Sequence, residues 1–398
     1  MFDSVRSTTL TRFILLYAAM YAAFGVASPF LPAFLSARGL LPEQLGLVLG
    51  TGTAVRLLTA PLAGRIGDLI QALRVVLIVC AALAASVTLG YLAGHGFWIL
   101  LGMNLLHAAS LAPITVLADA LALGSASPAP SGRRGFEYGW VRGTGSAAFI
   151  VGILLSGQAV SAFGLDLIVY LQALLLGAAA FAAILVPELI HARTADAVRA
   201  PAGGVLILLR LPLFRNLVLV AALILGSHAM HDAFAVIRWS ATGISPATAS
   251  LLWSESVAAE VLVFFVIGPA LVTWLAPAGA AAIAALAGML RWAVMAQTTD
   301  VIALALVQPL HGITFALLHL ACMRLIARTV PQGLEGTAQA IYGTVGIGAA
   351  TALLTLVSGA LYARLGAQGF WVMAALSALA FPLTWKLRQP VFGEGRTQ

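Results

Sequence analysis

Three arginines lie inside long apolar runs of the chain, where an unpaired charge is costly. They are Arg56, Arg142 and Arg291, in a sequence that is 61% hydrophobic and only 9% charged. A charge at membrane depth costs roughly 2.5–3.5 kcal/mol on insertion scales, so such residues usually face a polar cavity or pair with acids. Acidic and histidine residues also interrupt the apolar stretches: Asp119, Glu255, Glu260, His228, His231, His311 and His319. This pattern indicates a polar chamber inside a membrane protein and favours transport.

The chemistry that these residues can support is anion recognition coupled to proton movement. A guanidinium can bind a carboxylate through two parallel hydrogen bonds, which makes Arg142 a candidate for substrate binding. Glu260 and Arg291 are a candidate coupling pair, because a substrate that competes for the arginine changes the protonation of the carboxyl group. His311 can relay the proton or bind substrate. The alternative for Glu260 and Arg291 is a static ion pair between helices.

Helical spacing places several other polar residues. Gln308 lies one turn before His311 on the same face and can bind polar substrate atoms. His228 and Asp232 are one turn apart, so a hydrogen-bonded pair is expected, with His228 as a candidate substrate ligand.

Two further charged residues leave alternatives open. Asp119 is a candidate proton-exchanging partner of Arg142, or else a gate contact near the end of its helix. For Arg56 we favour a structural role, as the partner of an acid or as a side chain that extends to the membrane surface. An aromatic wall for the substrate can come from residues that otherwise pack or face lipid: Tyr17, Tyr21, Phe24, Phe149 and Trp253.

Composition places these residues in a polytopic helical membrane protein. The mean hydropathy of +1.02 over 398 residues excludes a soluble globular domain. Apolar stretches of about 20 residues match a helix that crosses the bilayer, and the period-2 pattern of a membrane β-barrel is absent. The net charge of +7 does not indicate nucleic-acid binding, because the arginines lie between apolar runs. The two cysteines, Cys80 and Cys322, are isolated and predict neither a metal site nor a disulfide framework.

The sequence predicts an all-α protein with twelve transmembrane helices. They are expected at 10–36, 43–66, 72–93, 97–123, 136–161, 165–186, 216–238, 246–268, 277–297, 301–327, 336–363 and 369–388. The first apolar run is too long for the core of a cleavable signal peptide, so it is expected to be the first span.

The connections between these helices alternate in charge. Of the 21 basic residues, 15 fall on the side of the termini, three on the opposite side and three inside the membrane. The positive-inside rule then places both termini in the cytoplasm of a bacterial inner membrane. One connection, 269–276, should be cytoplasmic and yet has no basic residue.

The chain divides into two similar halves. Residues 188–215 form the only long polar stretch and are expected to be a cytoplasmic linker between domains at 1–187 and 216–398. Asn104-Leu-Leu-His107 is echoed by Gln308-Pro-Leu-His311, and Tyr138-Gly139 by Tyr342-Gly343. Both echoes have an offset of 204 residues, about half the chain. Parallel six-helix repeats around a central cavity describe the major facilitator fold, with two pseudo-symmetric bundles.

A loop motif carries the first resemblance. Gly64-Arg-Ile-Gly-Asp68, with Arg74 six residues later, resembles the loop between the second and third helices of major facilitator transporters. The position after the aspartate is Leu69, where that motif has a basic residue. The resemblance implies that Asp68 and Arg74 form a gate contact, and a merely structural loop charge is the alternative.

Helix five carries a more specific resemblance. Tyr138-Gly-Trp-Val-Arg142-Gly-Thr-Gly-Ser-Ala-Ala-Phe149-Ile resembles the 3-phenylpropionate transporter family and its lactose permease and nucleoside symporter relatives. The second half agrees around Gly226-Ser-His228, Leu252-Trp253 with Glu260, Arg291-Trp292 and Gln308-Pro-Leu-His311. The resemblance therefore covers nearly the whole chain.

The resemblance also implies residue roles. Arg142 falls where lactose permease has its sugar-binding arginine, and Glu260, Arg291 and His311 fall on its buried glutamate, arginine and histidine. Thr314 stands where that transporter has a proton-bearing glutamate. The sugar-binding glutamate of helix four has no clean counterpart. Both departures argue against galactoside transport.

These observations predict a secondary transporter, neither an enzyme nor an ATP-driven pump, since the sequence has no P-loop and no nucleophile elbow. We expect proton-coupled uptake of a small organic solute, with a monocarboxylate such as 3-phenylpropionate favoured. The alternatives are a sugar or nucleoside symporter and an uncoupled facilitator or channel. The expected partners are the substrate, protons and the lipid bilayer. We expect a monomer that needs no cofactor.

Overall fold

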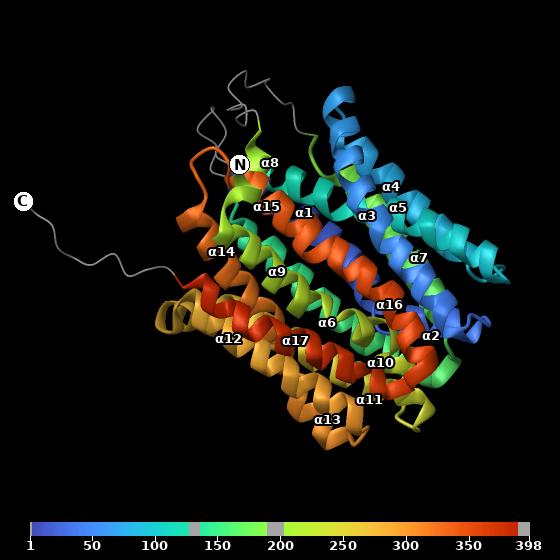
Figure 1. Ribbon diagram of the computed structural model, residues 1–398. Coiled ribbons are helices and arrows are strands. Elements are labelled where there is room, and N and C mark those ends of the chain that lie inside the picture. Colours follow the sequence, from blue (N-terminus) through green and yellow to red (C-terminus); the bar gives the residue numbers. More distant parts are fainter. Residues whose placement is uncertain (1, 127–135, 189–202, 389–398) are drawn as a thin grey trace, which may run out of the picture.

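The computed structural model describes residues 2–126, 136–188 and 203–388, and this part of the chain is helical without strands (Figure 1). The first half of the chain contains α1 (Phe2–Ala27), α2 (Leu31–Ala37), α3 (Pro42–Ile70), α4 (Leu73–Gly90), α5 (Phe97–Ala126), α6 (Tyr138–Phe163) and α7 (Leu167–Leu185).

The second half begins with α8 (Gly204–Arg210), α9 (Pro212–Gly226), α10 (Ala229–Ala241), α11 (Pro246–Leu262), α12 (Gly268–Gln297) and α13 (Val301–Val307). It ends with α14 (Leu318–Thr329), α15 (Glu335–Ile341), α16 (Ala350–Leu365) and α17 (Phe370–Thr384). Three π-helical segments join neighbouring α-helices: η1 (Val263–Ile267), η2 (Gly312–Leu317) and η3 (Tyr342–Ala349). Short 3₁₀ turns are η4 (Gly366–Gly369) and η5 (Trp385–Leu387).

Many of these helices have the length and composition of membrane spans. Within the described residues, ten continuous helical stretches are long and apolar enough to cross a bilayer. Two of them are much longer than one crossing requires: Pro246–Gln297 has 52 residues and Glu335–Leu387 has 53. Each is interrupted by a residue with positive φ, Ala276 at 55° and Gly366 at 54°.

The expected helix positions agree with the structure except at a few breaks. The span expected at 10–36 is divided by a turn before α2, and the span expected at 216–238 starts earlier and is divided between α9 and α10. The connection expected at 269–276 is wrong, because these residues continue as helix up to Ala276. The helix breaks there since Pro277 disfavours the α conformation of the residue that precedes it.

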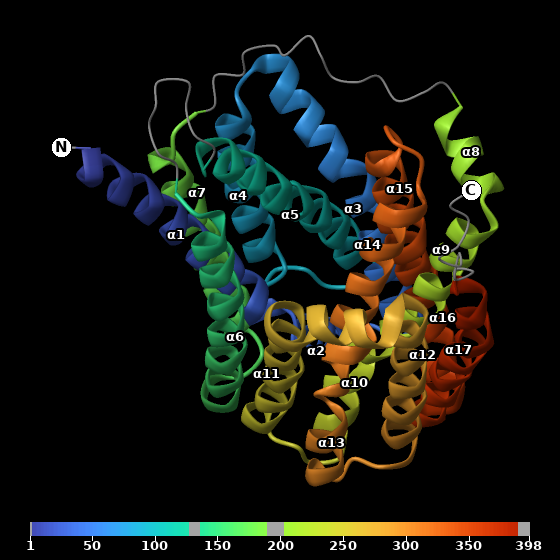
Figure 2. The same cartoon turned by 90° about the vertical axis from the view of Figure 1, so that its left-hand side faces the viewer.

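Close contacts between the two halves of the chain lie toward one end of the molecule. A Cβ atom on Gly46 of α3 would lie 2.7 Å from the Cα of Gly359 in α16. The backbone N–H of Ala247 in α11 donates to Ser161 Oγ in α6, at 3.2 Å. Figure 2 shows α6 and α11 side by side, with these ends away from α8 and the N-terminus.

Candidate functional site

Two adjoining cavities lie between the halves of the chain. The larger has a volume of about 660 Å³ and the smaller about 390 Å³. Their walls share Ser28, Phe149 and Asp232, so the two cavities meet at these residues. Helices α1 and α6 of the first half and α10 of the second half contribute to both cavities.

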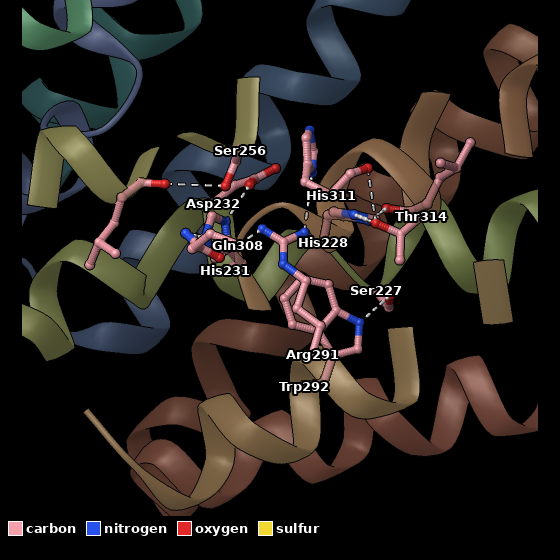
Figure 3. A network of polar contacts seen from close by, with 12 residues as sticks. Ser227, His228, His231, Asp232, Ser256, Arg291, Trp292, Gln308, His311 and Thr314 are labelled. Carbon is pink, nitrogen blue, oxygen red and sulfur yellow. Dashed lines mark hydrogen bonds and ion pairs between the residues drawn. The ribbon is translucent and has the colours of Figure 1, made fainter. Parts of the chain in front are cut away.

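A polar network centred on Arg291 forms one wall of the smaller cavity (Figure 3). Arg291 Nη1 lies 3.1 Å from His311 Nδ1, and His311 Nε2 lies 3.2 Å from Glu260 Oε2. On the other side, Arg291 Nη2 donates to Gln308 Oε1 at 3.1 Å. Arg291 itself has no exposed surface. Neighbouring side chains therefore connect this buried charge to the cavity.

The partners of this network fix the direction of its hydrogen bonds. Arginine only donates, so His311 Nδ1 accepts and its Nε2–H donates to Glu260. Gln308 accepts from Arg291 with its oxygen, so its amide nitrogen donates to His231 Nε2 at 3.3 Å. His231 Nδ1–H then donates to Asp232 Oδ1 at 3.1 Å. Two hydrogen-bonded arms thus run from one buried cation to two carboxylates at the cavity.

Close helix packing brings Glu260 and His311 together. Gly312 follows His311 at the start of η2, and a Cβ there would lie 2.6 Å from the carbonyl oxygen of Ala259. Because no side chain separates these backbones, η2 lies directly against α11 at the residue before Glu260. A π-helical turn inside an α-helix is frequently found at functional sites.

Arg142 of α6 faces the same cavity from the first half of the chain. Its guanidinium lies 4.8 Å from the centre of the Tyr21 ring, and it has no hydrogen bond or ion pair to any other described residue. Gly145, one turn later, leaves room for this ring, since a Cβ there would lie 2.8 Å from Tyr21. Arg142 is also close enough to Glu260 for their charges to interact. Its guanidinium therefore offers free hydrogen-bond donors to the smaller cavity.

Most of the residues expected at a substrate site line these cavities. The smaller cavity brings together Arg142, Arg291, His311, Glu260, Tyr21, Phe149 and Trp253, and the larger contains Phe24. Gln308 and His228 lie behind the wall, 0% and 5% exposed. His228 accepts from Thr314 Oγ1 at 2.9 Å, and its Nδ1–H faces the carbonyl oxygens of Ile224 and Leu225. Tyr17 packs on Tyr21 with ring centres 5.7 Å apart.

Three of the expected pairings differ in the structure. Glu260 does not contact Arg291 directly, because His311 stands between them. Asp232 is bonded by His231 instead of His228, whose nitrogens are taken by Thr314 and by backbone carbonyls.

The third difference concerns Asp119. Its carboxylate accepts hydrogen bonds from Tyr17 and from Tyr138, the latter at 2.8 Å, and not from Arg142. Two phenolic donors satisfy this carboxylate within the first half of the chain, and Asp119 itself lines neither of the two cavities.

The two residues of the expected gate are not paired with each other. Arg74 Nε lies 3.5 Å from Glu188 Oε2, and its Nη1 donates to the carbonyl oxygen of Val186 at 3.0 Å. Asp68 is exposed and makes no ion pair with the described residues. Asp68 precedes the end of α3, and Arg74 begins α4.

Three residues line the cavities although the sequence did not predict a substrate-binding or proton-coupling role for them. Asp232 lines both cavities, and its side chain is 56% exposed. Arg56 and His107 line the larger cavity. Each interrupts an apolar helix with a polar or ionisable group, which is the signal that could have identified all three. No group of residues suited to a metal ion occurs in the described chain.

Known proteins that resemble this chain are transporters. The sequence is 34% identical to the "Probable 3-phenylpropionic acid transporter" of Escherichia coli (strain K12), over 95% of this chain and 98% of that protein. The solved structure of nucleoside transporter NupG has a TM-score of 0.81 at 15% identity, covering 95% of this chain and 98% of that one. A bacterial homologue of the human lysosomal transporter Spinster, solved in an inward-facing conformation, has a TM-score of 0.72 at 14% identity and covers 96% of each chain.

The apolar helices, the central cavities and these likenesses define the class: a multi-pass membrane transporter of the major facilitator kind, and not an enzyme. The chain belongs to the family described as "MFS_1 like family", which matches residues 10–373. As a member of this family it is embedded in the membrane and transports a small-molecule substrate.

Proposed function

We propose that this protein is a proton-coupled secondary transporter that takes up a small monocarboxylate, such as 3-phenylpropionate, by alternating access. The observation that carries the proposal is the meeting of Arg142 from the first half with Glu260, His311 and Arg291 from the second half at one cavity. The 3-phenylpropionic acid named for the E. coli relative supports an aromatic carboxylate.

The charges at the two cavities favour an anion. Three arginines line them, against two carboxylates, Asp232 and Glu260, which leaves a formal excess of one positive charge. Excess charge in a low-dielectric cleft raises the local concentration of ions of opposite sign. Arg142 has free guanidinium donors, so we assign the substrate carboxylate to it. Tyr21, Phe149 and Trp253 then surround the remainder of the substrate.

Coupling is assigned to Glu260, which ends one arm of the Arg291 network. When Glu260 takes up a proton, its charge no longer competes with the substrate for Arg142. His311 holds the carboxyl group in place and connects it to Arg291, while Gln308 and His228 position this network from behind. Asp119 remains a second candidate for proton exchange through its tyrosine partners.

The proposed topology has twelve spans in two six-helix bundles. If each of the two interrupted stretches counts as two crossings, the number of candidate spans in the described residues rises from ten to twelve. We place residues 1–187 and 216–398 in the two bundles, with 188–215 as the linker. The linker contains α8 and the start of α9, and residues 189–202 lie outside the described part. The excess of basic residues near the termini supports an inner-membrane protein with both termini in the cytoplasm.

With this orientation the structure corresponds to an inward-facing state. The contacts between Gly46 and Gly359, and between Ala247 and Ser161, lie at the periplasmic end. The separation of Asp68 from Arg74 agrees with a cytoplasmic gate that is open. The cavity is complete within one chain, which supports a functional monomer.

Binding of 3-phenylpropionate to the purified protein tests the substrate assignment. We expect Arg142→Gln to weaken binding by about 10- to 100-fold, because a hydrogen bond to a charged group contributes roughly 1.5–3 kcal/mol. Arg12→Gln, an exposed arginine of α1, serves as the matched control and should bind normally. Equal affinity of Arg142→Gln and the wild-type protein would contradict the assignment. Parallel titrations with nucleosides and sugars test the alternative substrate classes.

A further inference from the structure

Arg56 is the third arginine that lies inside an apolar run, and the proposed mechanism does not use it. It lies in α3 and lines the larger cavity, to which its side chain is exposed. It makes no ion pair or hydrogen bond with the described residues, although Asp232 lines the same cavity. An arginine at membrane depth without a protein partner is costly, so a function that uses its charge is expected.

The packing of α3 against α5 places Arg56 next to His107. Asn104 Nδ2 of α5 donates to the carbonyl oxygen of Val48 in α3 at 2.7 Å, and Gly52 leaves space for the Asn104 side chain. Arg56 lies on the same face of α3, one turn after Gly52, and His107 follows Asn104 by one turn. The two side chains are close enough to interact electrostatically.

His107 is a polar side chain without a partner. It is 1% exposed and lines the larger cavity, and neither ring nitrogen has a hydrogen-bond partner among the described residues. Its nearest ring neighbour is Tyr91, edge-on at 5.6 Å, whose hydroxyl donates to Asn104. Leaving a buried polar group unsatisfied costs about 1–3 kcal/mol. A ligand atom that bonds to the imidazole would remove this cost.

An aromatic surface connects Arg142 with this second group of residues. The Tyr21 ring beside Arg142 contacts Phe24 edge-on, with ring centres 5.6 Å apart, and Phe24 lines the larger cavity. Phe149 lines both cavities. A substrate ring on this surface has its carboxylate at Arg142 and its far end directed into the larger cavity.

We propose that Arg56 and His107 form a second anion-binding subsite, which recognises an acidic oxygen group on the far end of an aromatic carboxylate. The inference rests on the proposed function, because one substrate carboxylate stays at Arg142, and it extends the substrate class from aromatic monocarboxylates to aromatic acids that carry a second acidic group. Arg56 binds the second carboxylate, and His107 turns toward the cavity to donate one hydrogen bond to it. The volume of about 660 Å³ falls within the range usual for small-molecule sites.

Three ligands and purified full-length protein test this subsite: 3-phenylpropionate, its para-carboxylated derivative and its para-methylated derivative. We expect the carboxylated acid to bind the wild-type protein more tightly than the methylated one. Arg56→Gln and His107→Phe should each weaken binding of the carboxylated acid by about tenfold and change binding of the parent acid much less. Normal binding of the parent acid also reports that each variant is folded.

The matched control is Arg65→Gln, an exposed arginine of the same helix outside both cavities, which should bind all three ligands normally. If Arg56→Gln does not fold, Arg56→Lys retains the charge and should lose part of the preference for the carboxylated acid. Unchanged affinity of the carboxylated acid in Arg56→Gln, or an equal loss for all three ligands, would overturn the subsite. If the wild-type protein does not bind the parent acid, the proposed substrate is wrong. The subsite is judged separately, by whether binding of the carboxylated acid depends on Arg56.

Discussion

Arg291 is fully buried and carries its charge to the cavity through two hydrogen-bonded arms. One arm ends at Glu260 through His311, and the other ends at Asp232 through Gln308 and His231. A buried cation is tolerated only when hydrogen bonds and opposite charges compensate for lost hydration. The network therefore connects both carboxylates to one fixed charge.

The arm through Glu260 gives a prediction about coupling. Glu260→Gln removes the proton-carrying group and keeps the size of the side chain, so substrate exchange across the membrane should persist while uphill uptake is lost. The measurement compares counterflow with accumulation in proteoliposomes. Glu255→Gln, five residues earlier on the same helix and outside both cavities, is the control and should retain both activities. Undiminished accumulation by Glu260→Gln would remove it as the proton carrier.

The sequence indicated which residues belong to this network, but not which of them contact one another. Intramembrane charge alone indicated Arg142, Glu260, Arg291 and His311, which line the smaller cavity. It could not show that His311 stands between Glu260 and Arg291, because side-chain bridges depend on the depth and rotation of three separate helices. The structural role that we favoured for Arg56 is similarly revised in our proposal, since spacing does not reveal whether a partner is within reach.

At the scale of the helices, glycines determine where the two halves meet. Gly46 and Gly359 allow the backbones of α3 and α16 to touch, and Gly157 makes room for Ser250 of α11. Small residues permit such close approach between membrane helices. Helix positions were predictable from apolar stretches, whereas the break at Ala276 depends on the proline that follows it, within an otherwise uninterrupted apolar run.

Enlarging one of these glycines should open the end of the molecule that is closed in the structure. Gly46→Val places carbon atoms against the Gly359 backbone, where a Cβ would lie 2.7 Å from its Cα. We expect slower uptake. The reporter is Ser28→Cys in a protein from which Cys80 and Cys322 have been removed. An impermeant thiol reagent added on the periplasmic side should label this reporter faster in Gly46→Val. Gly64→Ala in the same helix has open space around its Cβ and should behave normally. If the labelling of Gly46→Val matches that of Gly64→Ala, this contact does not hold the periplasmic end closed.

At the scale of the whole molecule, the proposal requires cavity groups from both halves to act together on one substrate. Ser28 and Phe149 of the first half and Asp232 of the second half form the shared boundary of the two cavities. Rocking of the halves about this region would expose the same residues to either side of the membrane. The helical membrane class followed from hydropathy, but the shape of the cavities depends on how the helices pack.

Proton-driven accumulation of labelled 3-phenylpropionate in proteoliposomes tests the central claim most directly. Neutral acid also crosses lipid by itself, so uptake by matched Arg142→Gln proteoliposomes is subtracted. With the outside more acidic than the inside, the account predicts protein-dependent accumulation above the external concentration, abolished by a protonophore. Protein-dependent uptake that stops at equal concentrations, with or without the gradient, would contradict it.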